Sequence, residues 1–126
     1  MAASHILVVD DDAQVLGMFL KVLAGRGYTV TGTTSGQEAI ETAAKARYDL
    51  AVVDLSMPEV GGFEVLKTLT GQRPHIKIVV ISGAMSGLML ESARIFGATS
   101  TLSKPVSPET LIATVADALQ GVRAAS

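Results

Sequence analysis

Acidic residues stand at the end of two short apolar segments of this chain. Asp10 and Asp11 follow the segment 6–9, and Asp54 ends the segment 50–54. Carboxylates held within a few ångströms of one another repel strongly unless a cation neutralises them. A site with only oxygen donors selects a hard cation, and Mg²⁺ binds one or two carboxylates while keeping several waters. If the fold brings these three acids together, we expect them to form a magnesium site.

A hydroxyl and a lysine follow two later segments. Ser82 comes after the β-branched segment 76–81, and Lys104 comes after the segment 99–102. A cation and a lysine neutralise the oxygens of a transferred phosphoryl group, and a hydroxyl binds one of them. A carboxylate such as Asp54 is then the nucleophile. Singly, these residues are more simply explained as a turn cap, a loop serine and a solvated lysine, but together they predict a phosphoryl-transfer site.

Strand-like and helix-like segments alternate five times along the chain. We expect strands at 6–9, 28–33, 49–54, 76–81 and 99–102, and helices near 13–24, 36–47, 62–69, 87–96 and 108–119. Asp12, Ser35 and Ser107 are suited to cap the helices that follow them. This alternation predicts an α/β fold of three layers, with a parallel sheet covered on both faces. Right-handed crossovers would bring the ends of all the strands, and the residues that follow them, to one edge.

Composition narrows the class of protein. The 126 residues are enough for one domain, which we expect to span 1–126 with an ordered core at about 4–120. The chain is 48% hydrophobic, but no apolar run approaches the roughly 18 residues of a membrane span, and no secretory signal is visible. A net charge of −2, 4% aromatic residues and no basic cluster argue against direct nucleic-acid binding. The lack of cysteine is compatible with the cytoplasm, where we expect the protein to act.

These motifs resemble those of the receiver domains of two-component response regulators, and the resemblance covers essentially the whole chain. It rests on ILVVDDD at the start, D-L-x-M-P around Asp54, Ser82 after its strand, and Lys104–Pro105. The resemblance implies a flavodoxin-like receiver fold, with a five-stranded parallel sheet in the order 2-1-3-4-5 and five helices. It also implies a cis peptide bond before Pro105.

The same resemblance assigns roles to the site residues. Asp54 would be the phosphoacceptor, and its donor would be a histidine kinase or a histidine-phosphotransfer protein. Ser82 and Lys104 would bind the phosphoryl oxygens. The groups implied to hold Mg²⁺ are Asp11 and Asp54 directly, the backbone carbonyl of Ser56, and Asp10 through water.

Two positions depart from the family pattern. Thr101 stands where the family usually carries an aromatic residue, and Val106 stands where many relatives have phenylalanine. Without a large ring at position 101, the usual coupling between the site and the surface of the fourth helix, fifth strand and fifth helix is in doubt. The simpler interpretation is that Thr101 is an exposed strand residue, and both interpretations stay open.

The first predicted helix carries two apolar rows. The buried stripe is expected to consist of Leu16, Leu20 and Leu23. The second row consists of Val15, Met18 and Val22. In the family this face docks a helix of the phosphodonor, and apolar residues suit such a contact. The alternative is a helix that is buried more widely than usual.

We therefore predict a signalling module, not an enzyme acting on metabolites, which acts on an output partner or belongs with a fused domain. The alternative is a small haloacid-dehalogenase-like phosphatase. That family also has an Asp-x-Asp motif after its first strand, here Asp10 and Asp12, with a later hydroxyl and lysine. Asp10 would then be the nucleophile and Asp54 would have no role. The chain is short for that family and lacks its second acidic pair.

Overall fold

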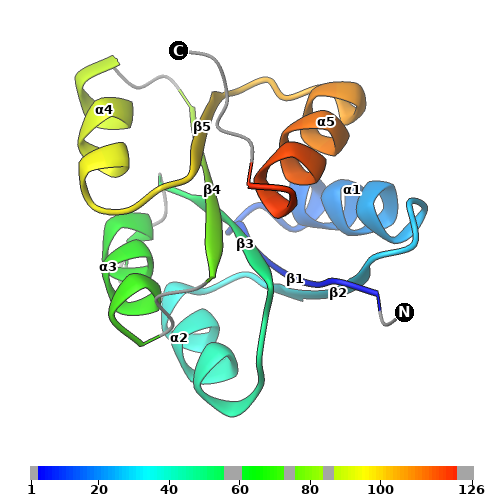
Figure 1. The fold of residues 1–126 in the computed structure, drawn as a ribbon, viewed down its shortest axis with the longest axis horizontal. Helices are drawn as coiled ribbons and strands as arrows, with labels where there is room; N and C mark the ends of the chain where they lie inside the picture. The colour runs from blue at the N-terminus through cyan, green and yellow to red at the C-terminus, as the bar shows by residue number, and fades with distance from the viewer. Residues whose placement is uncertain (1–2, 56–60, 73–75, 84–86, 122–126) are drawn as a thin grey trace.

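Five strands and five helices alternate along the chain (Figure 1), in a computed structural model that describes residues 3–55, 61–72, 76–83 and 87–121. The strands are β1 (His5–Val9), β2 (Thr29–Thr33), β3 (Leu50–Asp54), β4 (Lys77–Ser82) and β5 (Ser100–Ser103). The helices are α1 (Ala13–Ala24), α2 (Gly36–Lys45), α3 (Gly62–Gln72), α4 (Gly87–Ile95) and α5 (Pro108–Leu119). All strand pairs are parallel, and the order β2-β1-β3-β4-β5 confirms the predicted fold.

Three helices begin where the sequence places a capping residue. In each case the side-chain oxygen of the cap accepts a hydrogen bond from a backbone N–H two or three residues later, which satisfies a donor that the helix leaves free. The pairs are Asp12 with Gln14 N (2.9 Å), Ser35 with Glu38 N (2.9 Å) and Ser107 with Thr110 N (3.1 Å).

The sheet separates two apolar cores. Figure 1 shows α2, α3 and α4 on one face of the sheet and α1 and α5 on the other. Alternate residues of β3 lie in different cores. Ala51 and Val53 belong to the core on the side of α2, α3 and α4, and Leu50 and Val52 belong to the core on the side of α1 and α5. All four side chains are fully or almost fully buried, as the central strand of a doubly covered sheet requires. Within the described ranges no helix is long and apolar enough to cross a membrane.

The buried stripe of α1 differs from the prediction at one position. Leu16, Phe19 and Leu23 are buried, whereas Leu20 is only partly buried, so the prediction was wrong for Leu20 and missed Phe19. The reason is the edge position of β2. The side chain of Leu20 lies against the backbone of Gly32 on that strand, while Phe19 joins the core that α5 also covers.

Candidate functional site

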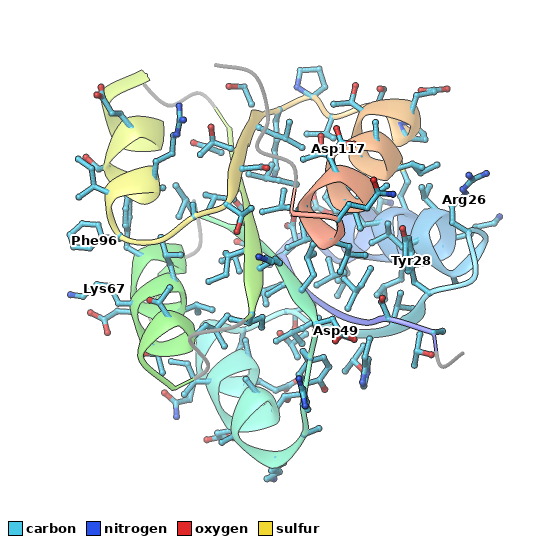
Figure 2. The ribbon with its side chains drawn as sticks, viewed as in Figure 1. Arg26, Tyr28, Asp49, Lys67, Phe96 and Asp117 are labelled. Carbon is cyan, nitrogen blue, oxygen red and sulfur yellow. The ribbon has the colours of Figure 1, made fainter. Side chains whose placement is uncertain are left out.

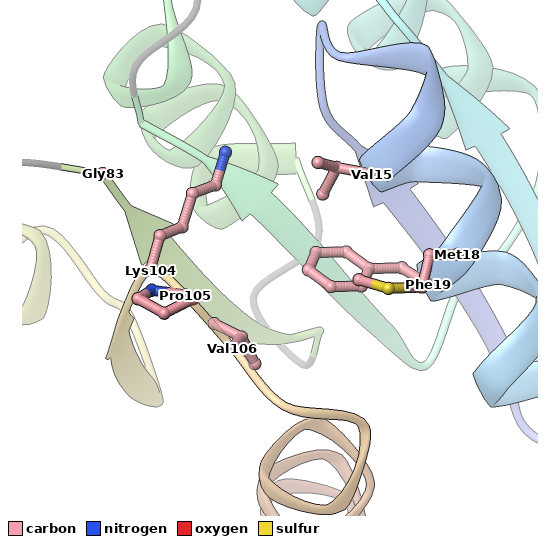
Figure 3. A pocket seen from close by; sticks show the side chains of 7 residues that line it. All are labelled: Val15, Met18, Phe19, Gly83, Lys104, Pro105 and Val106. Atoms are coloured by element: carbon pink, nitrogen blue, oxygen red, sulfur yellow. The ribbon is translucent and has the colours of Figure 1, made fainter.

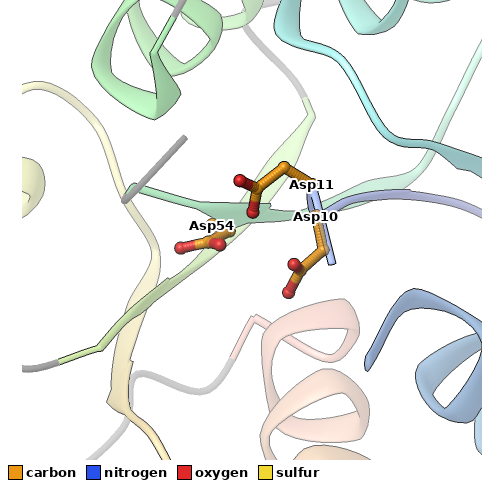
Figure 4. A group of neighbouring side chains, drawn as sticks. All are labelled: Asp10, Asp11 and Asp54. Atoms are coloured by element: carbon orange, nitrogen blue, oxygen red, sulfur yellow. The ribbon is translucent and has the colours of Figure 1, made fainter. Parts of the chain in front are cut away.

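Three carboxylates meet at the carboxyl edge of the sheet. Asp10 directly follows β1 and Asp54 ends β3, and these two strands are neighbours in the sheet. Ligand oxygens of Asp10, Asp11 and Asp54 all lie within 4.8 Å of one another (Figure 4). Asp10 and Asp54 are 1% and 2% exposed, while Asp11 is open to solvent. The structure therefore assembles the acidic cluster from segments more than forty residues apart in the sequence.

Lys104 supplies a positive charge to this cluster. Its Nζ lies 3.3 Å from Oδ2 of Asp54 and 3.4 Å from Oδ2 of Asp10. The lysine follows β5, and its backbone N–H donates to the carbonyl oxygen of Ser82 at 2.8 Å. The Lys104–Pro105 peptide bond is cis, the conformation that the family resemblance implies. One cation thus lies between two buried anions.

Asp10 is held firmly from the backbone side. Its N–H donates to the carbonyl oxygen of Thr33 at 3.2 Å, and its Oδ1 accepts from the N–H of Asp12 at 2.9 Å. Its Oδ2 accepts no well-formed hydrogen bond from the described residues, so the contact with Lys104 is an ion pair. This leaves one buried oxygen of Asp10 with a charge partner only.

Burial and charge shift two pKa values here in the same direction for different reasons. Burial raises the pKa of Asp10, and the nearby charge of Asp54 adds to this, against the lowering effects of the Asp12 N–H and Lys104. For Lys104, burial lowers the pKa, but the charges of Asp54 and Asp10 outweigh it and leave the pKa raised. Burial therefore disfavours the charged form of Asp10, whereas the charges of Asp54 and Asp10 favour the charged form of Lys104.

Ser82 brings an available hydroxyl next to the cluster. It ends β4, one residue beyond Ile81, which pairs with Asp54 across the sheet. Its side chain is fully buried, and its Oγ has no hydrogen-bond partner in the part of the chain that the structure describes. A buried hydroxyl without a hydrogen-bond partner costs folding free energy, so Ser82 Oγ is a candidate to bind a ligand at this site.

The donor set fits a hard divalent cation. The described part of the cluster offers only carboxylate oxygens, and two of these groups are buried beside each other. Mg²⁺ prefers such oxygen ligands and completes its shell with water, for which exposed Asp11 leaves access. Ser56, whose backbone carbonyl is a further predicted ligand, lies outside the described residues.

An apolar pocket adjoins the site on the side of α1. It has a volume of about 420 Å³ and lies between α1 and the segment that follows β5 (Figure 3). Its lining consists of Val15, Met18, Phe19, Gly83, Lys104, Pro105 and Val106. Met18 is 43% exposed, whereas Val22 does not line the pocket and packs partly buried against the core. Phe19 was not among the residues predicted for this face, although its helical spacing of four from Val15 could have indicated it.

Thr101 and Val106 depart from the family pattern, and neither is exposed: Thr101 is partly buried and Val106 is buried. Thr101 pairs with Val80 and is partly buried, so it is not the exposed strand residue of the simpler interpretation. Val106 is 9% exposed and packs in the core that α1 and α5 cover. Val106 also lines the apolar pocket beside α1, so its side chain borders open space as well as the core.

The chain matches a known protein family over most of its length. Residues 6–116 match the family model of the response regulator receiver domain. The response regulator SaeR of Staphylococcus aureus (strain USA300) is 32% identical over 109 residues, which cover 86% of this chain and 47% of that protein. The chain thus spans about half the length of the curated relatives that it matches.

Solved structures with this fold include the chemotaxis protein CheY4 of Vibrio cholerae, with 33% identity, a TM-score of 0.87 and coverage of 93% of this chain and 99% of that one. A CheY-like receiver domain protein from Methanospirillum hungatei JF-1 has 27% identity and a TM-score of 0.91, covering 95% and 96% of the two chains. A response regulator from Burkholderia pseudomallei, solved with a phosphorylated aspartic acid, a calcium ion and citrate, has 28% identity and a TM-score of 0.82. The match covers 93% of this chain and 66% of that one.

Proposed function

The chain belongs to the family of response regulator receiver domains, and from that premise we propose that it is a signalling module switched by phosphorylation of Asp54. The observation that carries the proposal is the position of this carboxylate, which is buried beside two other acids and 3.3 Å from a lysine. The donor would be the phosphohistidine of a histidine kinase or of a histidine-phosphotransfer protein.

In the proposed transfer, a carboxylate oxygen of Asp54 attacks the phosphorus atom. The new P–O bond forms as the P–N bond to the donor imidazole breaks, and the imidazole nitrogen keeps the electron pair. Lys104 Nζ neutralises one phosphoryl oxygen, and Ser82 Oγ donates a hydrogen bond to another. The free hydroxyl of Ser82 and the charge of Lys104 support these roles.

A bound Mg²⁺ would neutralise the charge that gathers on the phosphoryl group during transfer. Asp11 and Asp54 would bind the ion directly with the backbone carbonyl of Ser56, and Asp10 would bind it through water. The oxygen-only donor set supports this assignment. So does the Burkholderia relative, which holds a calcium ion together with its phosphorylated aspartic acid.

A small phosphodonor tests the phosphoacceptor directly. After incubation with acetyl phosphate and Mg²⁺, intact-mass spectrometry should show one added phosphoryl group on the wild type. Asp54→Asn should stay unmodified, while Asp117→Asn, which changes an exposed acid on α5, should be modified like the wild type. A phosphoryl group that still appears in Asp54→Asn would overturn the assignment.

The phosphatase alternative has less support. It needs Asp12 as a free acid two residues after the nucleophile Asp10, but Oδ1 of Asp12 accepts hydrogen bonds from the N–H groups of Gln14 and Val15 at 2.9 and 3.2 Å. Asp12 therefore serves as the cap of α1. Peptide mapping in the same experiment separates the two functions, because the phosphatase would carry its label on Asp10.

We also propose that the phosphodonor docks on the α1 side of the site. Exposed Met18 and half-buried Val15 line the apolar pocket beside Lys104, and Val22 continues the row along the helix. An apolar helix of the donor would bury these side chains and bring its phosphohistidine to Asp54. Binding of the phosphodonor would then depend on side chains that take no part in phosphoryl transfer.

The double variant Val15→Ala/Met18→Ala tests this docking. It should accept phosphoryl groups from acetyl phosphate at the wild-type rate but lose transfer from its cognate kinase, identified by profiling against the histidine kinases of the source organism. If transfer from the kinase to the folded fraction is unchanged while stability falls, the row is only part of the core.

A further inference from the structure

The strand β2 lies at one end of the sheet, and among the described residues no strand pairs with its outer side. Edge strands of natural proteins usually carry a charge, a proline or a bulge that prevents pairing with another chain. Strand β2 carries none of these, because its sequence is TVTGT and it pairs with β1 residue for residue. The outer side of β2 is therefore open to a further strand.

The alternation along β2 identifies the backbone groups on this open side. The N–H of Thr29 donates to the carbonyl oxygen of Ser4 at 3.0 Å, and the carbonyl oxygen of Thr33 accepts from the N–H of Asp10 at 3.2 Å, so Thr29 and Thr33 face β1. Successive residues of a strand direct their backbone groups to opposite sides. The N–H and C=O groups of Val30 and Gly32 therefore point outward, away from β1.

The sequence of β2 is self-complementary about its central residue, Thr31. We propose that β2 pairs antiparallel with β2 of a second copy of this chain, about a two-fold axis at Thr31. Val30 of each copy then faces Gly32 of the other, and their outward backbone groups form reciprocal hydrogen bonds. Thr29 faces Thr33, and Thr31 faces Thr31 of the other copy. Cross-strand threonine pairs of this kind stabilise sheets.

Apolar side chains on the α1 side of β2 fit the same register. Val30 is partly buried and packs against the core that α1 and α5 cover. A Cβ at Gly32 would lie 2.7 Å from Cδ1 of Leu20, so the side chain of Leu20 occupies the space above Gly32. Leu20 is itself only partly buried. In the pair, Val30 of the second copy lies opposite Gly32 and covers the exposed part of Leu20.

The charged residues on either side of β2 are also complementary. Arg26 and Glu38 are the charged residues closest to β2 along the chain. Both are exposed, neither forms an ion pair within the described ranges, and Figure 2 shows Arg26 pointing away from the molecule. Antiparallel pairing sets the start of one β2 beside the end of the other, so Arg26 of each copy lies at the end that carries Glu38 of the other. These charges favour a second copy over a strand that lacks this order.

The length of β2 sets the strength of the association. Its five residues span about 17 Å at about 3.3 Å per residue, whereas a stable interface has about 20–30 residues on each side. We therefore expect a monomer–dimer equilibrium that depends on concentration. The pairing uses backbone groups of Val30 and Gly32 and leaves the Thr33 carbonyl bound to Asp10, so the proposal does not rest on phosphorylation of Asp54.

Cysteine cross-linking of the full chain tests this register, because the chain has no cysteine of its own. Facing residues of a pair without hydrogen bonds have Cα atoms about 4.5 Å apart, within the range of a disulfide. Thr31→Cys should therefore form a covalent dimer on mild oxidation. Thr29→Cys is the matched control, because Thr29 is more exposed but lies about 13 Å along the paired strands from Thr29 of the other copy. It should stay monomeric.

Analytical ultracentrifugation gives a second measurement, in which the average mass of the wild type should rise with concentration. Thr31→Lys and Thr31→Glu each set like charges opposite each other and should weaken association roughly tenfold. An equimolar mixture should restore it, because lysine then faces glutamate. An unfolded variant would not be rescued in this way. A wild type that stays monomeric at the highest concentration, equal cross-linking of the two cysteine variants, or a mixture that stays monomeric would overturn the proposal.

Discussion

A methyl group at Gly62 would collide with the backbone of the proposed phosphoacceptor. Gly62 is the first residue of α3 and is buried. A Cβ at this position would lie under 3.0 Å from the carbonyl carbon and oxygen of Asp54 and from Cα of Leu55, an approach that real Cβ atoms essentially never make. The obstacle is backbone, so it cannot move aside as a flexible side chain does. Gly62→Ala should therefore displace either α3 or the end of β3.

Gly71 offers a matched control in the same helix. A Cβ there meets nothing within 4 Å, so Gly71→Ala should gain about 0.5–1 kcal/mol of unfolding free energy from helix propensity. Gly62→Ala should lose about 1–3 kcal/mol, the usual cost of overpacking. The variants should differ by about 1.5–4 kcal/mol, which corresponds to urea midpoints about 0.8–2 M apart at a typical denaturant dependence of about 2 kcal/mol per M.

Phosphorylation by acetyl phosphate gives a second measurement on the same two proteins. Displacement of Asp54 should slow the reaction of Gly62→Ala, even in its folded fraction, while Gly71→Ala should react like the wild type. Equal urea midpoints and equal reaction rates for the two variants would refute the inference that α3 begins in close contact with Asp54.

Three variants test the contacts of the site and of α5. Because the pKa of Asp10 is raised, protons should weaken Mg²⁺ binding at a pH above that expected for an ordinary Asp pKa of 3.8. Calorimetric titration with Mg²⁺ at several pH values would test this in the wild type and in Asp10→Asn. If Mg²⁺ binding to Asp10→Asn weakens over the same pH range as in the wild type, the prediction is wrong. Because the pKa of Lys104 is raised in the folded protein, its ion pairs contribute their full stability below pH 10.5, and this contribution is lost as the pH rises through the folded-state pKa. The free energy of unfolding measured in urea should show this loss in the wild type but not in Lys104→Met. Ser107→Ala removes the cap that accepts from Thr110 N and should cost about 1 kcal/mol of unfolding free energy without changing Asp54 phosphorylation.

The sequence predicted those parts of the site that depend on topology. Asp10, Asp54, Ser82 and Lys104 each follow or end an apolar segment, and a parallel sheet brings such positions to one edge whatever the details of packing. The caps Asp12, Ser35 and Ser107 were also predictable, because a cap depends on its own side chain and on the next three residues.

Features that depend on packing between distant elements could not be predicted. The choice between Leu20 and Phe19 depends on the edge position of β2, which places Gly32 beneath Leu20. The close approach of Gly62 to Asp54 and the exposure of Ile95 and Phe96 likewise arise only when α3 and α4 are placed on the sheet. Hydrophobic spacing identifies the apolar face of a helix but not which neighbour covers it.

The division of the apolar interior by β3 has a practical consequence for protein engineering. Its alternate side chains enter separate cores, so a substitution on the α1 side and one on the α3–α4 side share no side-chain partner. Changes in stability at such separated positions are expected to add. Substitutions on the surface proposed to receive the phosphodonor could then be combined with changes in the core on the α3–α4 side, giving variants with changed input, changed stability, or both, on one unchanged phosphorylation site.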